Sequence, residues 1–300
     1  MKSGIINVYK EKGFTSFDVV AKLRGILRTK KIGHTGTLDP DAEGVLPVCI
    51  GRATKVCDIL TDKDKVYEAV MLLGVETDTQ DTSGEILNEK PVEASEETVK
   101  ETIRSFVGDY AQVPPMYSAL KVNGKKLYEL AREGRTIERK ARNVQIFSIE
   151  ILEMDLPRVR MSIHCSKGTY IRTLCNDIGE KLGCGGCMEK LLRTRVGIFE
   201  LKDTLKLAQI EEFAKAGKAE EKIISVDELF EDYFKVWTKA AFDVVVHNGN
   251  RIEKRMFEEK LPEDTERLRV YDSEGVFIGI YEYSRERRDF KPVKMFYESH

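Results

Sequence analysis

The sequence lacks any hydrophobic run long enough to cross a membrane. A membrane-spanning helix needs about 20 consecutive apolar residues, and no stretch of this chain approaches that length. Residues 1–20 mix Asp, Glu and Lys with apolar positions and do not have the layout of a secretory signal peptide. We therefore expect a cytoplasmic protein with no membrane partner.

The sequence also carries little net charge. Lys and Arg total 49 and Asp and Glu total 51, for a net charge of −2. This balance is not that of a general polyanion binder, so any nucleic-acid site must be a local basic patch. Hydrophobic residues make up 41% of the 300 positions. That is enough for a sizeable core, in one large domain with a small one or in two medium ones.

Cysteines are few, six in all, and in an intracellular chain we expect them to be reduced. Cys184 and Cys187 form a CxxC pair, which can be half of a zinc site or a redox pair. The further zinc ligands would have to come from His164, Cys165 or Cys175, and this spacing is not that of a zinc ribbon or finger. We interpret all six as ordinary thiols and expect no metal, with zinc as the alternative.

Periodic apolar residues predict strands mixed with helices. We expect strands over 4–9, 66–74, 144–152 and 159–165. We expect helices over 16–27, capped by Ser16, over 96–107, ended by Gly108, over 170–182, closed by Gly183, and in two stretches within 207–232. From Val236 onward, short strands alternate with turns, so we place a domain boundary near residue 232. This mixture predicts an α/β or α+β core.

Residues 121–143 form a local basic segment. It contains eight Lys or Arg and three Glu, with Tyr117 and Tyr128 beside or within it. Such a segment is typical of phosphate contacts, although a solvated helix face with paired charges has the same composition. Gly124 and Gly134 favour a loop that can move.

Three carboxylates, Asp39, Asp41 and Glu43, lie close together in the stretch GHTGTLDPDAEG (33–44). An EF-hand calcium loop would need a bidentate Glu at its twelfth position, where this chain has Ile50, so we exclude calcium. A P-type ATPase motif would need Asp at Gly33, so we exclude phosphoryl transfer too. The remaining hypotheses are that Asp39, held extended before a proline, acts on a substrate, or that it only caps a turn.

Four long blocks of this chain resemble the TruB family of pseudouridine synthases. The blocks are GHTGTLDPDAEGVLPVCIGRATK (33–55), KVYEAVMLLGVETDTQDTSG (65–84), VPPMYSALKVNGKKLYELAREG (113–134) and HCSKGTYIRTLCNDIGEKLG (164–183). The resemblance covers residues 4–200 and implies an α+β fold, with a mixed β-sheet catalytic core flanked by helices. It also implies an enzyme that isomerises uridine 55 of the tRNA T-loop, without a cofactor.

The resemblance also implies roles for individual residues. Asp39 would act on the ribose, Arg172 would pair with Asp39, and Tyr67 would stack on the flipped uridine and help to remove its C5 proton. From periodicity alone Tyr67 is a core residue, because it shares a strand face with Ala69, Met71 and Leu73. The positions that match substrate-contacting residues of the family are His34, Tyr170 and Leu191.

The sequence departs from the family pattern at two supporting positions. Glu11 stands where the family's DKPxG motif has Pro, and Leu192 replaces the first Arg of the LRRT block.

Arg172 would lower the pKa of Asp39 because a guanidinium keeps its charge. We assign Asp41 and Glu43 to turn and surface roles.

Residues 233–300 resemble a PUA domain, a small β-rich RNA-binding module, which implies contact with the acceptor end of tRNA. We therefore divide the chain into a catalytic domain, 1–232, with an RNA-gripping insertion at 121–143, and a PUA-like domain. We expect a monomer that binds tRNA and needs no protein partner. The competing hypotheses are a guide-dependent rRNA enzyme, against which the 121–143 segment argues, and an RNA-binding or tRNA-folding protein whose catalysis is incidental.

Overall fold

The computed structural model describes residues 2–122 and 124–297. Its described strands form one large mixed sheet, one smaller sheet near the C-terminus and two short hairpins. The strands of the large sheet are β1 (Gly4–Lys10), β2 (Ile32–His34), β3 (Glu43–Ile50), β4 (Lys65–Leu73), β7 (Gly108–Gln112), β10 (Arg142–Asp155), β11 (Arg158–Cys165), β12 (Gly186–Val196) and β13 (Phe199–Glu200). The fold is therefore α+β, as predicted.

The large sheet is ordered β1-β3-β12-β4-β11-β10-β7, with β2 paired to β3 and β13 to β12. All of these pairs are antiparallel except β12 with β3, which is parallel. This parallel contact joins two antiparallel halves of the sheet. It also places the end of β12 beside the beginning of β3, immediately after the GHTGTLDPDAEG stretch.

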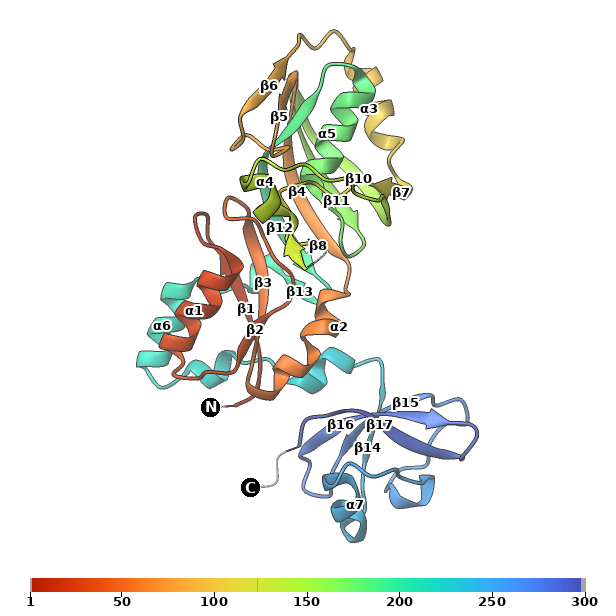
Figure 1. The fold of residues 1–300 in the computed structure, drawn as a ribbon. Coiled ribbons are helices and arrows are strands. Elements are labelled where there is room, and N and C mark those ends of the chain that lie inside the picture. The colour runs from red at the N-terminus through yellow and green to blue at the C-terminus, as the bar shows by residue number, and fades with distance from the viewer. Residues whose placement is uncertain (1, 123, 298–300) are drawn as a thin grey trace.

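Helices cover the two halves of the sheet separately. The described helices are α1 (Ser16–Ile26), α2 (Cys57–Thr61), α3 (Glu96–Arg104), α4 (Leu127–Arg132), α5 (Ile171–Leu182), α6 (Leu207–Lys215) and α7 (Asp243–His247). In Figure 1, α3 and α5 lie beside β4, β10 and β11, whereas α1 and α6 lie beside β1 and β3. Each side buries its own apolar cluster against the sheet. None of the described helices is long and apolar enough to cross a membrane.

The C-terminal sheet has a core of its own. It is ordered β14 (Phe234–Trp237), β15 (Arg267–Tyr271), β16 (Phe277–Ser284) and β17 (Asp289–Met295). Its buried cluster draws all its members from residues 236–290. In Figure 1 this sheet lies apart from the large sheet. Ile280 on β16 and Phe296 after β17 share a buried cluster with residues before and within α2, among them Val56 and Leu60. The remaining strands, in the two hairpins, are β5 (Val75–Thr77), β6 (Ile86–Glu89), β8 (Lys121–Val122) and β9 (Lys125–Lys126).

Two predicted helices are shorter than the sequence pattern suggested. α3 ends at Arg104, because the Ser105 hydroxyl donates to the carbonyl of Thr102 at 2.6 Å, and Gly108 begins β7 instead of closing the helix. The second helical stretch within 207–232 is also wrong. α6 ends at Lys215, and the chain beyond it forms only short 3-10 turns. There Ile224 forms an antiparallel β-bridge with Ile5 of β1, so the backbone is extended at this point.

Of two predicted helix ends, one is confirmed and one is corrected. Gly183 closes α5 in a left-handed conformation with a φ of 80°. The cap of α1 is Thr15 rather than the predicted Ser16, since the Thr15 hydroxyl accepts from the backbone N–H of Asp18 at 3.0 Å. Ser16 instead contacts the functional loop.

Candidate active site

The loop formed by residues 35–42 joins β2 to β3 and carries Asp39. Because β2 and β3 pair antiparallel, both ends of the loop are fixed to the same part of the sheet. Thr35, buried at the start, donates from its hydroxyl to the carbonyl of Pro47 at 3.1 Å. At the other end, the N–H of Ala42 donates to the carbonyl of Asp39 at 3.1 Å and closes a tight turn. The carboxylate is therefore held on a rigid support.

Two buried side chains hold the same loop from β1 and α1. The Ser16 hydroxyl accepts from the backbone N–H of Leu38 at 2.9 Å. The ammonium of Lys10, which is fully buried, donates to the carbonyls of Pro40 at 3.0 Å and Ala42 at 2.5 Å. Burial lowers the pKa of Lys10 to about 8, against the opposing effect of nearby carboxylates. Leu38 and Pro40, the residues on either side of Asp39, are thus hydrogen-bonded to buried side chains.

Arg172 pairs with Asp39, as the family resemblance implied. Its Nη2 lies 3.3 Å from Oδ1 and 3.2 Å from Oδ2 of Asp39, and it also donates to the carbonyl of Tyr117 at 2.7 Å. A second carboxylate, that of Asp81, lies 3.7 Å from Nη1. The side chain of Arg172 is 6% exposed and that of Asp39 is 40% exposed. The cation is therefore part of the interior, while the carboxylate reaches the surface.

The pKa of Asp39 differs from the prediction. We expected a guanidinium to hold the pKa of this carboxyl group down. Arg172 does lower it, but burial has the larger effect, and the negative charge of Asp81 adds to it, so the pKa of Asp39 lies above its usual value. Arg172 thus opposes protonation and favours the ionised carboxylate.

Arg172 is positioned by the start of α5. Tyr170 precedes this helix, and the side chain of Gln112, buried on β7, bonds both polar groups of the Tyr170 backbone. Gln112 Nε2 donates to the Tyr170 carbonyl at 2.9 Å, and its Oε1 accepts from the Tyr170 N–H at 2.8 Å. Leu174 and Ile178 on the same helix are fully buried in the core. The helix entry is therefore fixed to the sheet two residues before Arg172.

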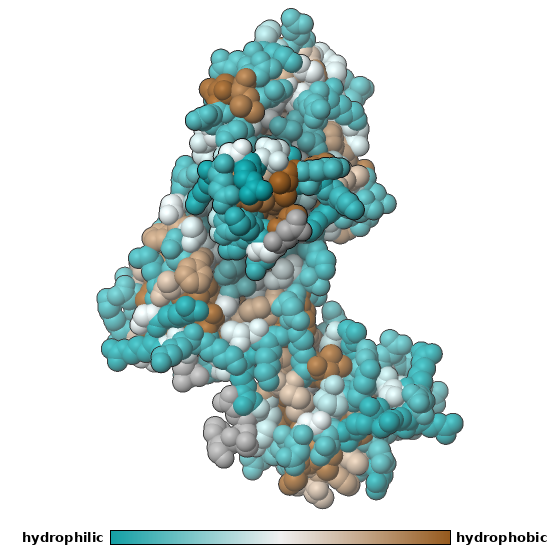
Figure 2. Space-filling view, viewed as in Figure 1, coloured by the Kyte–Doolittle hydropathy of each residue, from teal (hydrophilic) through white to brown (hydrophobic). Residues whose placement is uncertain are grey.

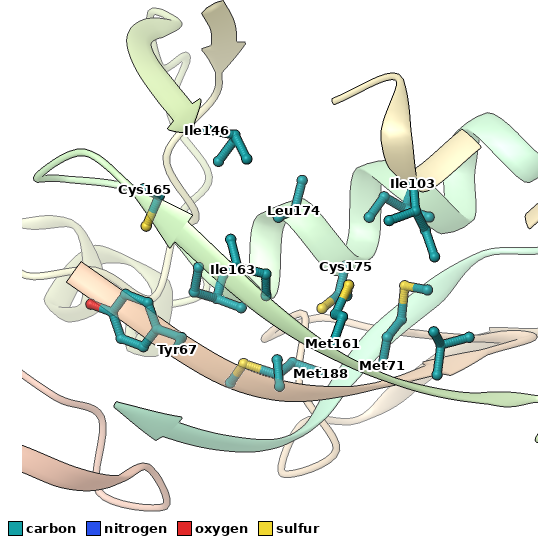
Figure 3. Packing of buried hydrophobic residues seen from close by; sticks show 14 of the residues in the cluster. Tyr67, Met71, Ile103, Ile146, Met161, Ile163, Cys165, Leu174, Cys175 and Met188 are labelled. Atoms are coloured by element: carbon teal, nitrogen blue, oxygen red, sulfur yellow. The ribbon is translucent and has the colours of Figure 1, made fainter. Parts of the chain in front are cut away.

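Tyr67 lies at one end of the apolar cluster that α5 and α3 form with the sheet. Its ring belongs to this cluster with Ala69 and Met71, as the period of β4 predicted, and it is 8% exposed. Figure 3 shows its hydroxyl pointing away from the other labelled side chains. Burial raises the pKa of Tyr67, while the adjacent Arg193 guanidinium and a hydrogen bond to it lower the pKa. Tyr67 is thus a core residue with a polar end near the site.

Arg193 on β12 is a site residue that the sequence analysis missed. It pairs directly with Tyr67 across the two strands, is almost fully buried, and donates from Nε to the carbonyl of Val45 at 2.7 Å. Its Nη2 donates to the carbonyl of Gly36 at 3.3 Å. The strand period from Leu191 places this Arg on the inward face, which is the signal that could have identified it.

The remaining predicted contact residues lie around this centre. The His34 side chain is only half-buried at the end of β2, but its Nδ1 is buried, without a hydrogen-bond partner among the described residues. Burial and the charge of Arg193 lower the pKa of His34. Tyr170 and Leu191 are half-buried, and Leu191 packs against the main core cluster.

The basic segment 121–143 is partly ordered secondary structure, not a simple loop. It forms the β8–β9 hairpin and α4, whose Leu127 and Leu130 are buried; Asn123 lies outside the described residues. The Tyr128 ring accepts cation–π contacts from two flanking cations, at 5.2 and 5.5 Å. The segment begins just after Tyr117, whose carbonyl binds Arg172. This links its base directly to the candidate site.

Asp41 lies in a turn at the surface, as predicted, whereas Glu43 begins β3 and is half-buried. Asp41 is 63% exposed and lies 3.7 Å from Lys12, and Glu43 accepts from the Tyr9 hydroxyl. All six cysteines are free thiols, with Cys184 and Cys187 buried. Within the described ranges, no three His, Cys, Asp or Glu side chains converge on a point that would hold a metal ion.

The chain matches two family models along most of its length. Residues 24–171 match a TruB family pseudouridylate synthase N-terminal domain, and residues 172–231 match a tRNA pseudouridylate synthase B C-terminal domain. It is 57% identical to tRNA pseudouridine synthase B of Lachnoclostridium phytofermentans, over 98% of this chain and 99% of that protein. It is 47% identical to the protein of the same name from Clostridium acetobutylicum, over 97% and 99% of the two chains.

Solved structures share the fold. A structure of a Cbf5-Nop10-Gar1 complex aligns with a TM-score of 0.72 and 26% identity, covering 98% of this chain and 84% of that one. A structure of an H/ACA RNP bound to a substrate RNA containing 2′-deoxyuridine aligns with the same TM-score at 23% identity, covering 98% and 85% of the chains. The architecture built around Asp39 and Arg172 is therefore an established protein fold.

Proposed function

The chain belongs to the TruB family of pseudouridylate synthases, and on this basis we propose that it isomerises uridine 55 in the T-loop of tRNA. It is an isomerase that forms pseudouridine in tRNA, the activity for which its full-length relatives are named. The observation that carries the proposal is the ion pair of Arg172 with Asp39 at 3.2 Å, on a loop anchored from both sides.

The reaction breaks the bond from N1 of uracil to C1′ of the ribose and joins C5 to C1′. C5 loses a proton and N1 gains one, so no electrons are exchanged and no cofactor is required. Asp39 acts on the sugar, as a nucleophile at C1′ or as a base at C2′, and both roles require the ionised carboxylate. Because burial favours the protonated acid, the charge of Arg172 supports either role.

The target uridine leaves the base stack before reaction, which costs a few kcal/mol. We assign to Tyr67 the stacking contact with the flipped base and assistance in removing the C5 proton. Its hydroxyl, beside the cationic Arg193, supports this role. His34 fills the space left by the base, and two half-buried residues, Tyr170 and Leu191, line the remaining contact.

We propose that residues 1–232 form the catalytic domain and residues 233–300 a PUA-like domain that contacts the acceptor end of tRNA. The apolar cluster that residues 236–290 bury among themselves supports this division. Lys294 binds Asp58 of the catalytic part, and Lys291 and Arg285 pair with glutamates. Arg287 and Arg288 have no ion pair among the described residues, so we propose that they take part in this RNA contact. We further propose a cytoplasmic monomer that needs no protein partner.

The second candidate function is RNA binding or tRNA folding with incidental catalysis. The basic segment 121–143 and the C-terminal sheet favour it, because both would serve binding alone. The bond from Arg172 to the carbonyl of Tyr117, a few residues before the insertion, favours catalysis instead, since it places the base of the insertion beside the reacting carboxylate.

Release of tritium from C5-labelled uridine tests the proposal. The protein is mixed with an unmodified tRNA transcript, and tritium in water is counted. We expect one equivalent of tritium per tRNA, and none when uridine 55 is replaced by cytidine. Release that persists in the cytidine transcript would refute the proposed position, and tight binding without release would favour the RNA-binding function.

A further inference from the structure

Two thiols that the proposed chemistry does not use lie close together between β3 and the start of α2. Cys49 on β3 is fully buried, and Cys57 is the first residue of α2. Cys49 pairs directly with Gly33 of β2, and a Cβ on Gly33 would lie 3.2 Å from the sulfur of Cys57. Residues that pair directly across antiparallel strands extend to the same face with their Cβ atoms about 5 Å apart. The sulfur of Cys57 therefore lies beside the side chain of Cys49, in room that a glycine leaves.

The two thiols differ in how readily they ionise. Cys49 is a buried member of an apolar cluster that includes Leu60 of α2, and Cys57 packs against this cluster half-buried. Cys49 donates a hydrogen bond to the sulfur of Cys57, which raises the pKa of Cys49 and lowers the pKa of Cys57. The cation of Lys294 also lowers the pKa of Cys57, against the opposing effects of burial and of Asp58. Cys57 is therefore the thiol of the two that forms a thiolate.

Cys57 is also the thiol that small molecules in water can reach. It lines a cavity of about 590 Å³ together with Gly33 and residues of α1. Figure 2 shows a mixture of hydrophilic and hydrophobic residues on the surface over α1 and α2. The other five of the six cysteines are buried, and burial raises the pKa of Cys165, Cys175 and Cys187. Because the thiolate is the reactive form of cysteine, an oxidant should meet Cys57 first.

We propose that Cys57 and Cys49 are a peroxide-sensitive pair that closes reversibly to a disulfide. The Cys57 thiolate attacks one oxygen of hydrogen peroxide, the O–O bond breaks, and hydroxide leaves from a sulfenic acid on Cys57. The Cys49 thiol then gives up its proton and attacks the sulfur of Cys57, so that an S–S bond forms while the S–O bond breaks and water leaves. Two thiols thus lose two electrons, which the peroxide gains, and a dithiol reductant reverses the step by thiol–disulfide exchange.

The disulfide would join β3 to α2 across the 3-10 turn Gly51–Val56. Within this turn, Arg52 donates to the carbonyl of Phe296 at 2.9 Å. Lys55 donates to the carbonyl of Met295 at 2.8 Å. Oxidation should therefore restrain the segment that contacts the end of the C-terminal sheet, and the amides of this turn should exchange with solvent more slowly in the oxidised protein. Equal exchange in the two forms would contradict the cross-link.

Mass spectrometry of the full-length protein tests the proposal. The reduced protein is treated with hydrogen peroxide at neutral pH, its remaining thiols are alkylated in denaturant, and the product is digested with trypsin. Trypsin cleaves after Arg52 and Lys55, so the two cysteines separate into peptides 32–52 and 56–63 unless a disulfide joins them. We expect these two peptides to be found joined, the free thiols to fall by two from the original six, and dithiothreitol to restore both.

Serine variants separate the roles of the two thiols. In Cys49→Ser the sulfenic acid of Cys57 has no partner, so a 1,3-diketone reagent should trap it, whereas Cys57→Ser should leave Cys49 reduced. Cys184 and Cys187, a buried CxxC pair, are the control within the same chain and should stay reduced under the same treatment. Oxidation of wild-type Cys57 no faster than that of Cys184 would overturn the proposal. So would a sulfur acid on Cys57 that persists while Cys49 stays a free thiol.

Discussion

Replacing Lys10 by Met should remove a buried charge at little net cost in stability. Burial lowers the pKa of Lys10 from its usual 10.5 to about 8, and at about 1.36 kcal/mol per pKa unit the buried cation costs about 3 kcal/mol at neutral pH. Met is of similar length and relieves this cost. Met cannot donate a hydrogen bond, so the carbonyls of Pro40 and Ala42 lose their donor. Each unpaired carbonyl costs about 1–3 kcal/mol of stability. The free energy of unfolding at pH 7 should therefore fall by no more than about 3 kcal/mol.

The dependence of stability on pH gives an independent test of the same charge. In the unfolded chain the amine titrates near 10.5 and in the folded chain near 8. Between these values the unfolded state holds more protons, so the Lys10 contribution makes the wild type more stable as pH rises from 8 toward 10.5. Denaturant unfolding at pH 7, 8, 9 and 10 should show a smaller rise in the Met variant. Lys65, whose pKa burial also lowers to about 8, is the matched control, because its ammonium donates to carbonyls outside the loop.

Activity should respond differently from stability. Without Lys10 the loop that carries Asp39 loses its anchor, and a displacement of about 1 Å at a reacting group can reduce the rate roughly 10²-fold. We expect kcat for tritium release to fall by roughly 10- to 100-fold in Lys10→Met, with tRNA binding within about twofold of wild type. Lys65→Met should show the same pH effect with a smaller loss of kcat. An unchanged kcat, or an unchanged pH profile of stability, would refute the reasoning.

The other predictions concern the groups around the ion pair. Arg172→Met should reduce kcat and move the acidic limb of the pH–rate profile to higher pH, because losing the cation raises the pKa of Asp39; an unmoved limb would show that Arg172 does not support ionisation. Gln112→Ala should lose about 1–3 kcal/mol of stability, measured by denaturant unfolding, and lower kcat more than tRNA affinity, since it removes both bonds to the Tyr170 backbone. Gly44→Ala should destabilise the fold by at least about 2 kcal/mol, because its φ is 104° and a Cβ would lie 2.2 Å from the carbonyl oxygen of Arg193; a thermal midpoint equal to wild type would contradict this geometry.

Local patterns were sufficient to predict the elements whose period or caps are clear. The alternation along β4 predicted both its inward face and the burial of Tyr67. The apolar stripe of α5, with Gly183 after it, predicted that helix to within one residue. These elements depend on interactions between residues close in sequence, which a periodic pattern records directly. The prediction was wrong after Arg104, where α3 ends, and after Lys215, where no second helix follows, because side-chain and tertiary contacts overrode the pattern there.

The candidate site was only partly predictable. Asp39, Arg172 and the contact residues were assigned through resemblance, and their geometry brings Asp39 and Arg172 together. The strand period could have placed Arg193 on the inward face of β12, but its partner Val45 lies about 150 positions away in the chain. Lys10 is buried where β1 pairs with β3 and where it bonds to the loop, and no local pattern records this. A Lys at a strand end is ordinarily solvated, so its role in holding the loop appears only once the strands are assembled.

Single-turnover tritium release by Asp39→Asn tests the central claim most directly. Asn keeps the size of the side chain and can still accept a hydrogen bond from Arg172, but it carries no charge and cannot act on the ribose. We predict that this variant binds the tRNA transcript with a Kd within about threefold of wild type and releases no tritium above background. Release at a rate near wild type would contradict catalysis by Asp39.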